Sequence, residues 1–172
     1  MNEATERTSR KARLTIRPYQ DTDLGPLLTI MNEIIACGDA FAYDMPFTPQ
    51  QMAEYLDTYP TAFVAMLNRR VAGGYVLRAN QPGRGSHVAN ATYLVASQTR
   101  GHGIGKMLGE HSLVEARRQG FTAIQFNAVV STNTGAVTLW QKLGFKIVGT
   151  VPNAFRHVRG RHVDLHIMHR LL

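Results

Sequence analysis

Cysteine is almost absent from this sequence, which contains Cys37 and no other. An internal disulfide is therefore excluded, and such low cysteine usage is typical of proteins kept in a reducing cytoplasm. Cys37 ends a segment with helical periodicity and precedes Gly38. Because no cation or histidine lies near it in the sequence to stabilise a thiolate, we expect a buried structural thiol rather than a nucleophile.

Long apolar runs are also missing. None approaches the roughly 20 residues that a helix needs to span a membrane. Residues 1–13 are polar and charged and lack the apolar segment of a secretory signal, so we expect a mobile N-terminal arm there, with an edge strand as the alternative. We find neither repeats nor a low-complexity linker. Residues 14–172 are long enough for one domain with a sizeable core.

Acidic residues are the scarcer charge, with 12 Asp and Glu against 19 Lys and Arg, which gives a net charge of +7. This balance favours a polyanionic partner, either nucleic acid or a phosphate-rich cofactor. The basic residues are scattered rather than gathered into one run, so the cofactor is the better interpretation and nucleic-acid binding the weaker alternative.

Hydrophobic periodicity and turn signals predict strands and helices that alternate along one α/β domain. Strands are expected at 14–17, 63–67, 71–78, 87–95, 122–130, 145–151 and 163–169. Helices are expected from Asp21 or Asp23 to Cys37, from Thr48 or Pro49 to about 59, from near Gly103 to about Gln119, and from Asn133 to about Leu143.

Three glycines lie between Arg100 and Lys106, in the stretch RGHGIGK, after a strand and before a helix. The free N–H groups of a helix start attract anions, and glycines let a phosphate approach the backbone without meeting a Cβ. The two cations can add charge-assisted bonds. The stretch fits neither the Walker pattern nor G-x-G-x-x-G. We therefore predict a pyrophosphate site, in preference to a glycine-rich surface turn.

Two motifs in this order resemble those of the GNAT family of acyl-CoA-dependent N-acetyltransferases. Arg100, Gly103 and Gly105 fill the pattern R/Q-x-x-G-x-G/A, and residues 133–145, NTGAVTLWQKLGF, are similar to the second family signature. The resemblance implies acetyl-CoA as the cosubstrate. It also implies an α/β (α+β) fold whose mixed, mostly antiparallel sheet is flanked by helices and split at a V-shaped opening.

The same resemblance implies which residues bind acetyl-CoA. Pantetheine would lie in the opening and pair with the backbone of Tyr93, Leu94 and Val95, while Asn133 would contact the cofactor near its pantetheine arm. The pyrophosphate would bind N–H groups and cations of the glycine stretch, which comprises Arg100, Gly101, His102, Gly103, Ile104, Gly105 and Lys106.

Acetyl transfer requires that the amine lose a proton, that the oxyanion be stabilised and that the thiolate gain a proton. The tyrosine that usually protonates the thiolate in this family matches Trp140, which is a poor acid and is expected in the core. The strands flanking the opening carry no acidic residue, and His87 lies at a distal end where a surface position is expected. Asn90, Asn127 and Asn133 remain the candidate catalytic residues, as groups that orient reactants or donate to an oxyanion.

This asparagine trio, together with FNAVVSTN and LWQKLGF, is similar to the fungal acetyltransferases that act on azetidine-2-carboxylate and related proline analogues. In that group, asparagines at the matching positions handle substrate and cofactor. The similarity implies a small amine or amino acid, bound by Asn90 and Asn127. Phe41 and Tyr43 belong to a loop that borders the acceptor site in the family, although ordinary packing of the loop onto the core is the alternative.

The histidines near the end of the chain do not predict a metal site. His162, Asp164 and His166 share one face of a strand by alternation, and an exposed face accounts for them. We therefore expect a cytoplasmic N-acetyltransferase without a metal, a nucleic-acid partner or a membrane, and a homodimer is possible. An enzyme acting on a protein or antibiotic amine and a non-catalytic acyl-CoA sensor remain alternatives.

Overall fold

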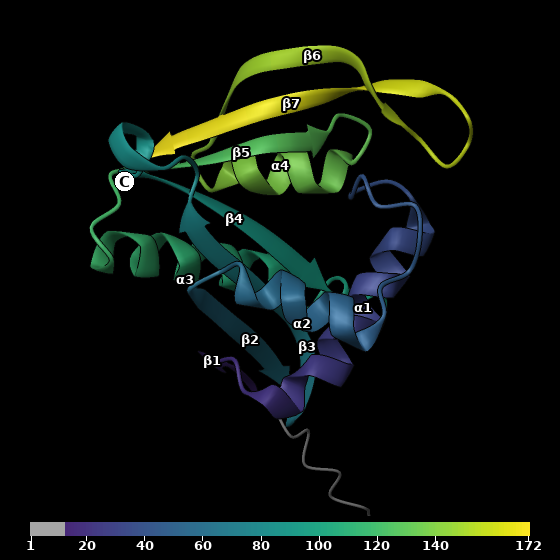
Figure 1. Cartoon of the computed structure of the whole chain (residues 1–172), viewed down its shortest axis with the longest axis vertical. Coiled ribbons are helices and arrows are strands. Elements are labelled where there is room, and N and C mark those ends of the chain that lie inside the picture. Colours follow the sequence, from purple (N-terminus) through teal and green to yellow (C-terminus); the bar gives the residue numbers. More distant parts are fainter. Residues whose placement is uncertain (1–12) are drawn as a thin grey trace, which may run out of the picture.

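A seven-stranded sheet with the strand order β1-β2-β3-β4-β5-β7-β6 forms the centre of the computed structural model, which describes residues 13–172 (Figure 1). Every neighbouring pair is antiparallel except β4 and β5, which run parallel. The predicted mixed, mostly antiparallel sheet is confirmed. The strands are β1 (Leu14–Pro18), β2 (Thr61–Leu67), β3 (Arg70–Ala79), β4 (Val88–Val95), β5 (Ala123–Val130), β6 (Lys146–Arg156) and β7 (His162–Leu171).

Four α-helices flank this sheet, as the sequence predicts. They are α1 (Leu24–Cys37), α2 (Pro49–Asp57), α3 (Ile104–Arg118) and α4 (Thr134–Lys142), and 3-10 turns occur at η1 (Asp21–Asp23), η2 (Gly83–Gly85) and η3 (Ser97–Thr99). None of the helices within residues 13–172 is long and apolar enough to cross a membrane.

The sheet splits between its two parallel strands. β4 and β5 pair only at Val88 with Ala123 and at Ala89 with Ile124, and they separate beyond these residues. β5 instead pairs with β7, and its register shifts between Phe126 and Val129. The edge of β4 that faces β5 is therefore left without a strand partner along most of its length, and this opening is the predicted V.

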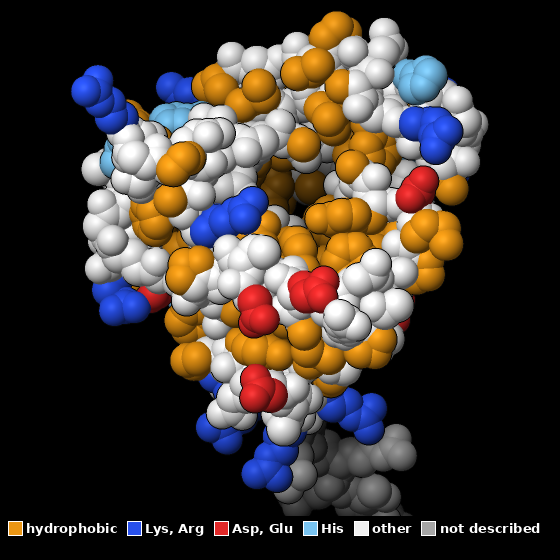
Figure 2. Space-filling view, in the orientation of Figure 1, with side chains coloured by type: hydrophobic (Ala, Val, Ile, Leu, Met, Phe, Trp, Pro, Cys, Tyr) orange, Lys and Arg blue, Asp and Glu red, His pale blue; other side chains and the backbone are white. Residues whose placement is uncertain are grey.

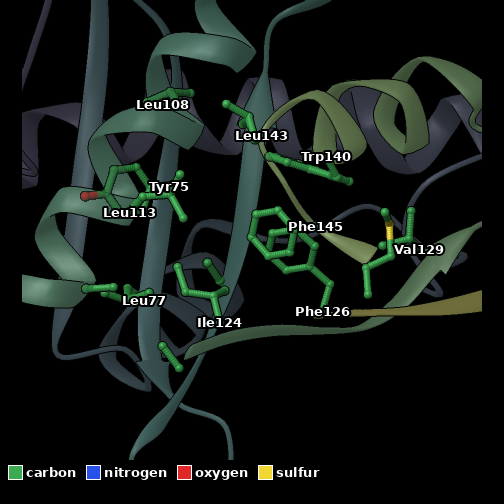
Figure 3. Close-up of a cluster of buried hydrophobic side chains, with 14 of the residues drawn as sticks. Tyr75, Leu77, Leu108, Leu113, Ile124, Phe126, Val129, Trp140, Leu143 and Phe145 are labelled. Carbon is green, nitrogen blue, oxygen red and sulfur yellow. The ribbon is translucent and has the colours of Figure 1, made fainter. Parts of the chain in front are cut away.

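Each face of the sheet has its own core. On one face, α3 and α4 pack over Phe126, Trp140 and Phe145; the rings of Phe126 and Phe145 stack with centroids 4.3 Å apart (Figure 3). On the other face, α1 and α2 bury an aliphatic cluster that includes Met31, Met52 and Leu94. Because the two clusters lie on opposite faces, a passage through the split connects the α3–α4 side with the α1–α2 side.

Local signals set the helix ends close to their expected positions. Thr48 caps α2, because its hydroxyl accepts the Gln51 N–H at 3.2 Å and the Gln51 side chain accepts the Thr48 N–H at 2.8 Å. Gly38 ends α1 in the left-handed conformation at φ 61°. Asp23 differs from the prediction: it precedes α1 but makes no side-chain cap, since its carboxylate binds Arg17 and the Gln20 N–H.

Cys37 is exposed, so the prediction of a buried thiol was wrong. It lies seven residues after the buried Ile30 and therefore on the same side of α1, but the exposed Ala36 and Cys37 form the end of the helix. Helical periodicity identifies which face of a helix is buried, but not how far along the helix the neighbouring elements cover that face. The predicted arm lies outside the described residues apart from Arg13, whose N–H donates to Asn68 Oδ1 and whose carbonyl accepts the Asn68 N–H.

Candidate active site

A cavity of about 460 Å³ occupies the split in the sheet. In Figure 2 a hollow walled largely by hydrophobic side chains opens between the β5–β7 part of the sheet and α1–α2. The cavity is lined from both faces: Ala136, Leu139 and Trp140 come from α4, whereas Tyr55 comes from α2. It therefore joins two compartments through the plane of the sheet, one beside α3 and α4 and the other beside α1 and α2.

The glycine-rich turn presents free backbone donors at the start of α3. Gly101 and Gly103 have φ values of 82° and 75°, which favour glycine, and a Cβ on either would meet no atom within 4 Å. Gly103 precedes α3 without a side-chain cap. No acceptor in the part of the chain that the structure describes receives the N–H groups of Gly101, Gly103, Ile104, Gly105 and Lys106. Such a row of donors fits a diphosphate.

The side chains of the turn do not all face the cavity. Arg100 and Gly105 line it, whereas Lys106 lies on the surface 3.6 Å from Glu110 and the His102 ring contacts backbone carbonyls of its own turn. The Ile104 side chain is buried in the α3–α4 core. A phosphate could therefore use Arg100 as a cation and Ile104 through its backbone N–H alone, whereas the His102 N–H already donates to the Thr99 carbonyl at 3.4 Å.

The strand residues expected to bind pantetheine lie at the edge of the opening. Tyr93 and Val95 line the cavity, but the Leu94 side chain is buried on the α1–α2 face. The Tyr93 ring packs 4.6 Å from Trp140, and its hydroxyl lies 2.6 Å from the Ser112 hydroxyl. Burial raises the pKa of the Tyr93 hydroxyl, so this phenol stays protonated and packs as part of the core.

Asn90 and Asn127 lie on opposite sides of the split, at its narrow end. Asn90 Nδ2 donates to the Gln125 carbonyl at 2.9 Å, which leaves its Oδ1 and its second N–H free. Asn127 Oδ1 accepts from Gln125 Nε2 at 2.9 Å, and its Nδ2 donates to Asn80 Oδ1 at 2.7 Å. Both amides are thus held in place while keeping polar atoms available to a ligand. Both line the cavity.

Asn133 lies at the wide end of the cavity and caps α4. Its Oδ1 accepts the Ala136 N–H at 3.2 Å, which leaves its Nδ2 group free. Trp140 is 7% exposed, in agreement with the prediction of a core residue, although its edge also lines the cavity. The structure thus brings the three predicted asparagines to one cavity without supplying a tyrosine at the position of Trp140.

The α1–α2 compartment is aromatic. Phe41 and Tyr43 line it together with Tyr55 and Tyr59, whose rings lie 5.1 Å apart, and contact of Phe41 and Tyr43 with an acceptor stays a prediction. Asn32 of α1 fixes the loop, since its side chain exchanges two hydrogen bonds with the backbone of Phe47. Burial raises the pKa of Tyr43 and of Tyr55, and the neighbouring Tyr59 raises that of Tyr55 further.

Among the lining residues that carry a hydroxyl or a carboxylate, four were not among the predicted site residues: Asp39, Tyr55, Tyr59 and Thr92. Thr92 could have been found by alternation, because it is two residues after Asn90 and so lies on the same strand face. The other three belong to a loop and to the α2 region, where no local motif marks them.

The histidines and the aspartate that the sequence offered as possible base or metal ligands lie away from the cavity. His87 is exposed and does not line the cavity. On β7, His166 Nδ1 lies 2.9 Å from the Thr150 hydroxyl, and Asp164 accepts the Asn153 N–H at 2.9 Å. Within residues 13–172 no group of three or more His, Cys, Asp or Glu side chains is placed to hold a metal ion.

Comparisons with known proteins agree with this geometry. The model of the acetyltransferase (GNAT) family matches residues 28–145. A GCN5-related N-acetyltransferase from Kribbella flavida superposes with a TM-score of 0.88 at 43% identity, over 92% of this chain and 98% of that one. A phosphinothricin acetyltransferase from Sinorhizobium meliloti, solved in complex with AcCoA, shares the fold with a TM-score of 0.86 at 23% identity, over 92% of this chain and 88% of that one.

Relatives are also found by sequence. N-acetyltransferase aca1 of Schizosaccharomyces pombe is 37% identical over 97 residues, which are 55% of this chain and 46% of aca1. The L-methionine sulfoximine/L-methionine sulfone acetyltransferase of Pseudomonas aeruginosa is 28% identical over 90% of this chain and 92% of its own length. The chain thus spans about half the length of aca1. None of these similarities bears on azetidine-2-carboxylate.

Family membership implies acetyl transfer from acetyl-CoA to an amine, and the row of free donors at α3 is consistent with a coenzyme A diphosphate. The matched segment covers all the cavity-lining residues, the glycine-rich turn and the second signature. On these grounds the chain belongs to the acetyltransferase (GNAT) family.

Proposed function

We propose that this chain transfers the acetyl group of acetyl-CoA to the amine of a small molecule, in a ternary complex and without an acyl-enzyme. One observation carries the proposal: a single cavity passes through the split sheet, with free N–H donors on its α3 side and oriented amides at its narrow end. Acetyl-CoA supplies the thioester when bound. The free N–H groups of the glycine-rich turn, those of Gly101 and of residues 103–106, and the Arg100 guanidinium hold its diphosphate.

The acceptor enters from the α1–α2 compartment and meets Asn90 and Asn127. The free Oδ1 of Asn90 accepts an N–H of the amine, and the free N–H of Asn127 aids its orientation. The amine nitrogen forms a bond to the carbonyl carbon, the C–S bond breaks, the nitrogen releases one proton to water, and the departing thiolate takes a proton from water. Backbone N–H near Val95 stabilises the oxyanion, since β4 lacks a strand partner on this side.

The acceptor we propose is a small amine or an amino acid. A cavity of about 460 Å³ with aromatic walls suits a compact acceptor better than a long chain. A relative with similarity along 90% of this chain is an L-methionine sulfoximine/L-methionine sulfone acetyltransferase, which supports an acceptor of amino-acid type. A proline analogue is within the same class.

A product screen tests this proposal. The purified chain would be incubated with acetyl-CoA and separate amino acids, proline analogues, polyamines, aminoglycosides and peptides, with thiol release and a mass gain of one acetyl group as readouts. Acetylation of small amino compounds above the amine-free hydrolysis rate is the expected result. Exclusive acetylation of peptides would overturn the substrate class, and binding of acetyl-CoA without any product would favour the acyl-CoA sensor.

A further inference from the structure

The cavity contains one carboxylate that no sequence motif marks. Asp39 is the only acidic residue and Arg100 the only basic residue among the lining residues within the described chain. Asp39 is partly buried, and within residues 13–172 it makes neither a hydrogen bond nor an ion pair. Both strands of the split lack acidic residues, so the step that removes the acceptor's proton has no other carboxylate along the cavity wall.

The residue before Asp39 is fixed by two sets of contacts. The preceding Gly38 closes α1, with its N–H shared by the carbonyls of Ile34 and Ile35 at 3.4 and 3.0 Å. The Gly38 carbonyl accepts the N–H of Val158, from the β6–β7 connection, at 3.3 Å. Val158 packs so closely that a Cβ at Gly38 would lie 2.6 Å from it. The carboxylate therefore projects from a fixed point rather than from a free loop.

Its surroundings attract cations. The C-terminal carbonyls of α1 carry a partial negative charge, which adds to that of the carboxylate. Tyr43, Tyr55 and Tyr59 line the same compartment, and aromatic faces bind ammonium groups. Of the other charged groups, the Arg78 guanidinium lies 4.6 Å from the centre of the Tyr59 ring, so that ring already carries a cation and Tyr43 and Tyr55 are the aromatic groups left for an ammonium ion. Asp44 lies 4.0 Å from Arg156 at the surface, and Arg100 belongs to the cofactor turn.

We infer that Asp39 binds the acceptor as an ammonium ion and takes its proton before attack. In this step the carboxylate accepts one proton from the R–NH3+ group, which leaves a neutral amine with a lone pair for the thioester carbon. The inference rests on the proposed acetyl transfer and assigns the base that Asn90 and Asn127 cannot provide, since amides do not take protons at neutral pH. General-base assistance of this kind contributes about 10²–10⁴-fold.

The test compares Asp39→Asn with Asp44→Asn, a matched change at the exposed surface pair, using L-methionine sulfone and 2-phenylethylamine as acceptors. At pH 7.5 we expect kcat/KM of Asp39→Asn to fall about 100-fold while acetyl-CoA affinity stays unchanged. Its rate should rise about tenfold per pH unit towards the pKa of the acceptor amine, because only the free amine reacts. Asp39→Glu should recover part of the rate, and Asp44→Asn should match the wild type.

Each outcome decides the inference. A wild-type rate or a wild-type pH profile in Asp39→Asn would overturn it. If the wild-type chain does not bind acetyl-CoA, the proposed function itself is refuted. If neither amine is acetylated, the test becomes calorimetric binding of benzyltrimethylammonium, a cation that cannot react. Binding about tenfold weaker to Asp39→Asn than to the wild type supports the cation site. Equal binding by the two proteins overturns it.

Discussion

The Asn90 side chain donates a hydrogen bond of 2.9 Å to the Gln125 carbonyl, next to the last pair of residues that joins β4 to β5. The amide thus replaces a backbone partner at the point where the two strands separate. Its Oδ1 stays free and can accept from a ligand. Asn90 therefore lies where the pairing of β4 with β5 ends, and it also lines the narrow end of the cavity.

Replacing Asn90 or Asn127 by Ala should reduce kcat about 10- to 100-fold, because each loses an atom that orients the reactants. Acetyl-CoA affinity should change little, since the diphosphate site lies at the other end of the cavity. Steady-state kinetics and calorimetry separate the two quantities. Asn80→Ala removes only the acceptor of the Asn127 Nδ2 hydrogen bond, so it should lower kcat less. Full catalytic rates in both Asn90→Ala and Asn127→Ala would show that these residues have no catalytic role.

Arg100→Gln should raise KM for acetyl-CoA about tenfold, because a charge-assisted bond to the diphosphate is lost. The difference from the wild type should shrink at high salt, where ions screen the guanidinium. Arg84→Gln is a matched control, since Arg84 is exposed in η2 and does not line the cavity. Equal KM values for the two variants would remove Arg100 from the binding site.

The ion pair of Arg17 and Asp23 should make the free energy of unfolding depend on pH. Asp23, with a side chain 4% exposed, accepts from Arg17 at 2.6 and 2.7 Å, and this bonding lowers the pKa of Asp23. A lowered folded-state pKa stabilises the fold above the unfolded value of about 4, and the stabilisation is lost as pH falls through the folded value.

Asp23→Asn should therefore lower the free energy of unfolding by about 2 kcal/mol at pH 7, and the difference should close towards pH 2. Urea unfolding at several pH values measures it. Asp44→Asn, at a pair 4.0 Å apart on the surface, should change stability little. A constant difference between Asp23→Asn and the wild type across this pH range would contradict the assignment.

Gly109 allows α3 and α4 to approach each other behind the cavity. A Cβ at this position would lie 2.4 Å from Leu143 Cδ1 and 3.2 Å from Trp140 Cζ3, whereas a Cβ at Gly25 in α1 would meet nothing within 4 Å. Gly25→Ala should raise the free energy of unfolding by about 0.5–1 kcal/mol through helix propensity. Gly109→Ala should lower it by about 1 kcal/mol, since overpacking exceeds that gain. Equal stabilisation by both substitutions would contradict this packing.

Much of the fold could be predicted from the sequence, because its signals are local. Thr48 and Asn133 precede their helices and cap them, and the RGHGIGK turn precedes α3 as expected. The α1–α2 compartment of the cavity could not be predicted in the same way. Asp39 reaches the cavity only because the β6–β7 connection packs on Gly38, a contact between segments more than a hundred residues apart. Neither periodicity nor spacing along the chain encodes such a contact.

The proposed function depends on binding of the coenzyme A diphosphate by the free N–H groups at the start of α3 and by Arg100. Calorimetric titration with acetyl-CoA and with S-acetylpantetheine, which has the same thioester arm but no diphosphate, tests it most directly. We predict that acetyl-CoA binds about 100-fold more tightly, as two charge-assisted bonds would give. Equal affinities, or no uptake of acetyl-CoA by folded protein, would contradict it.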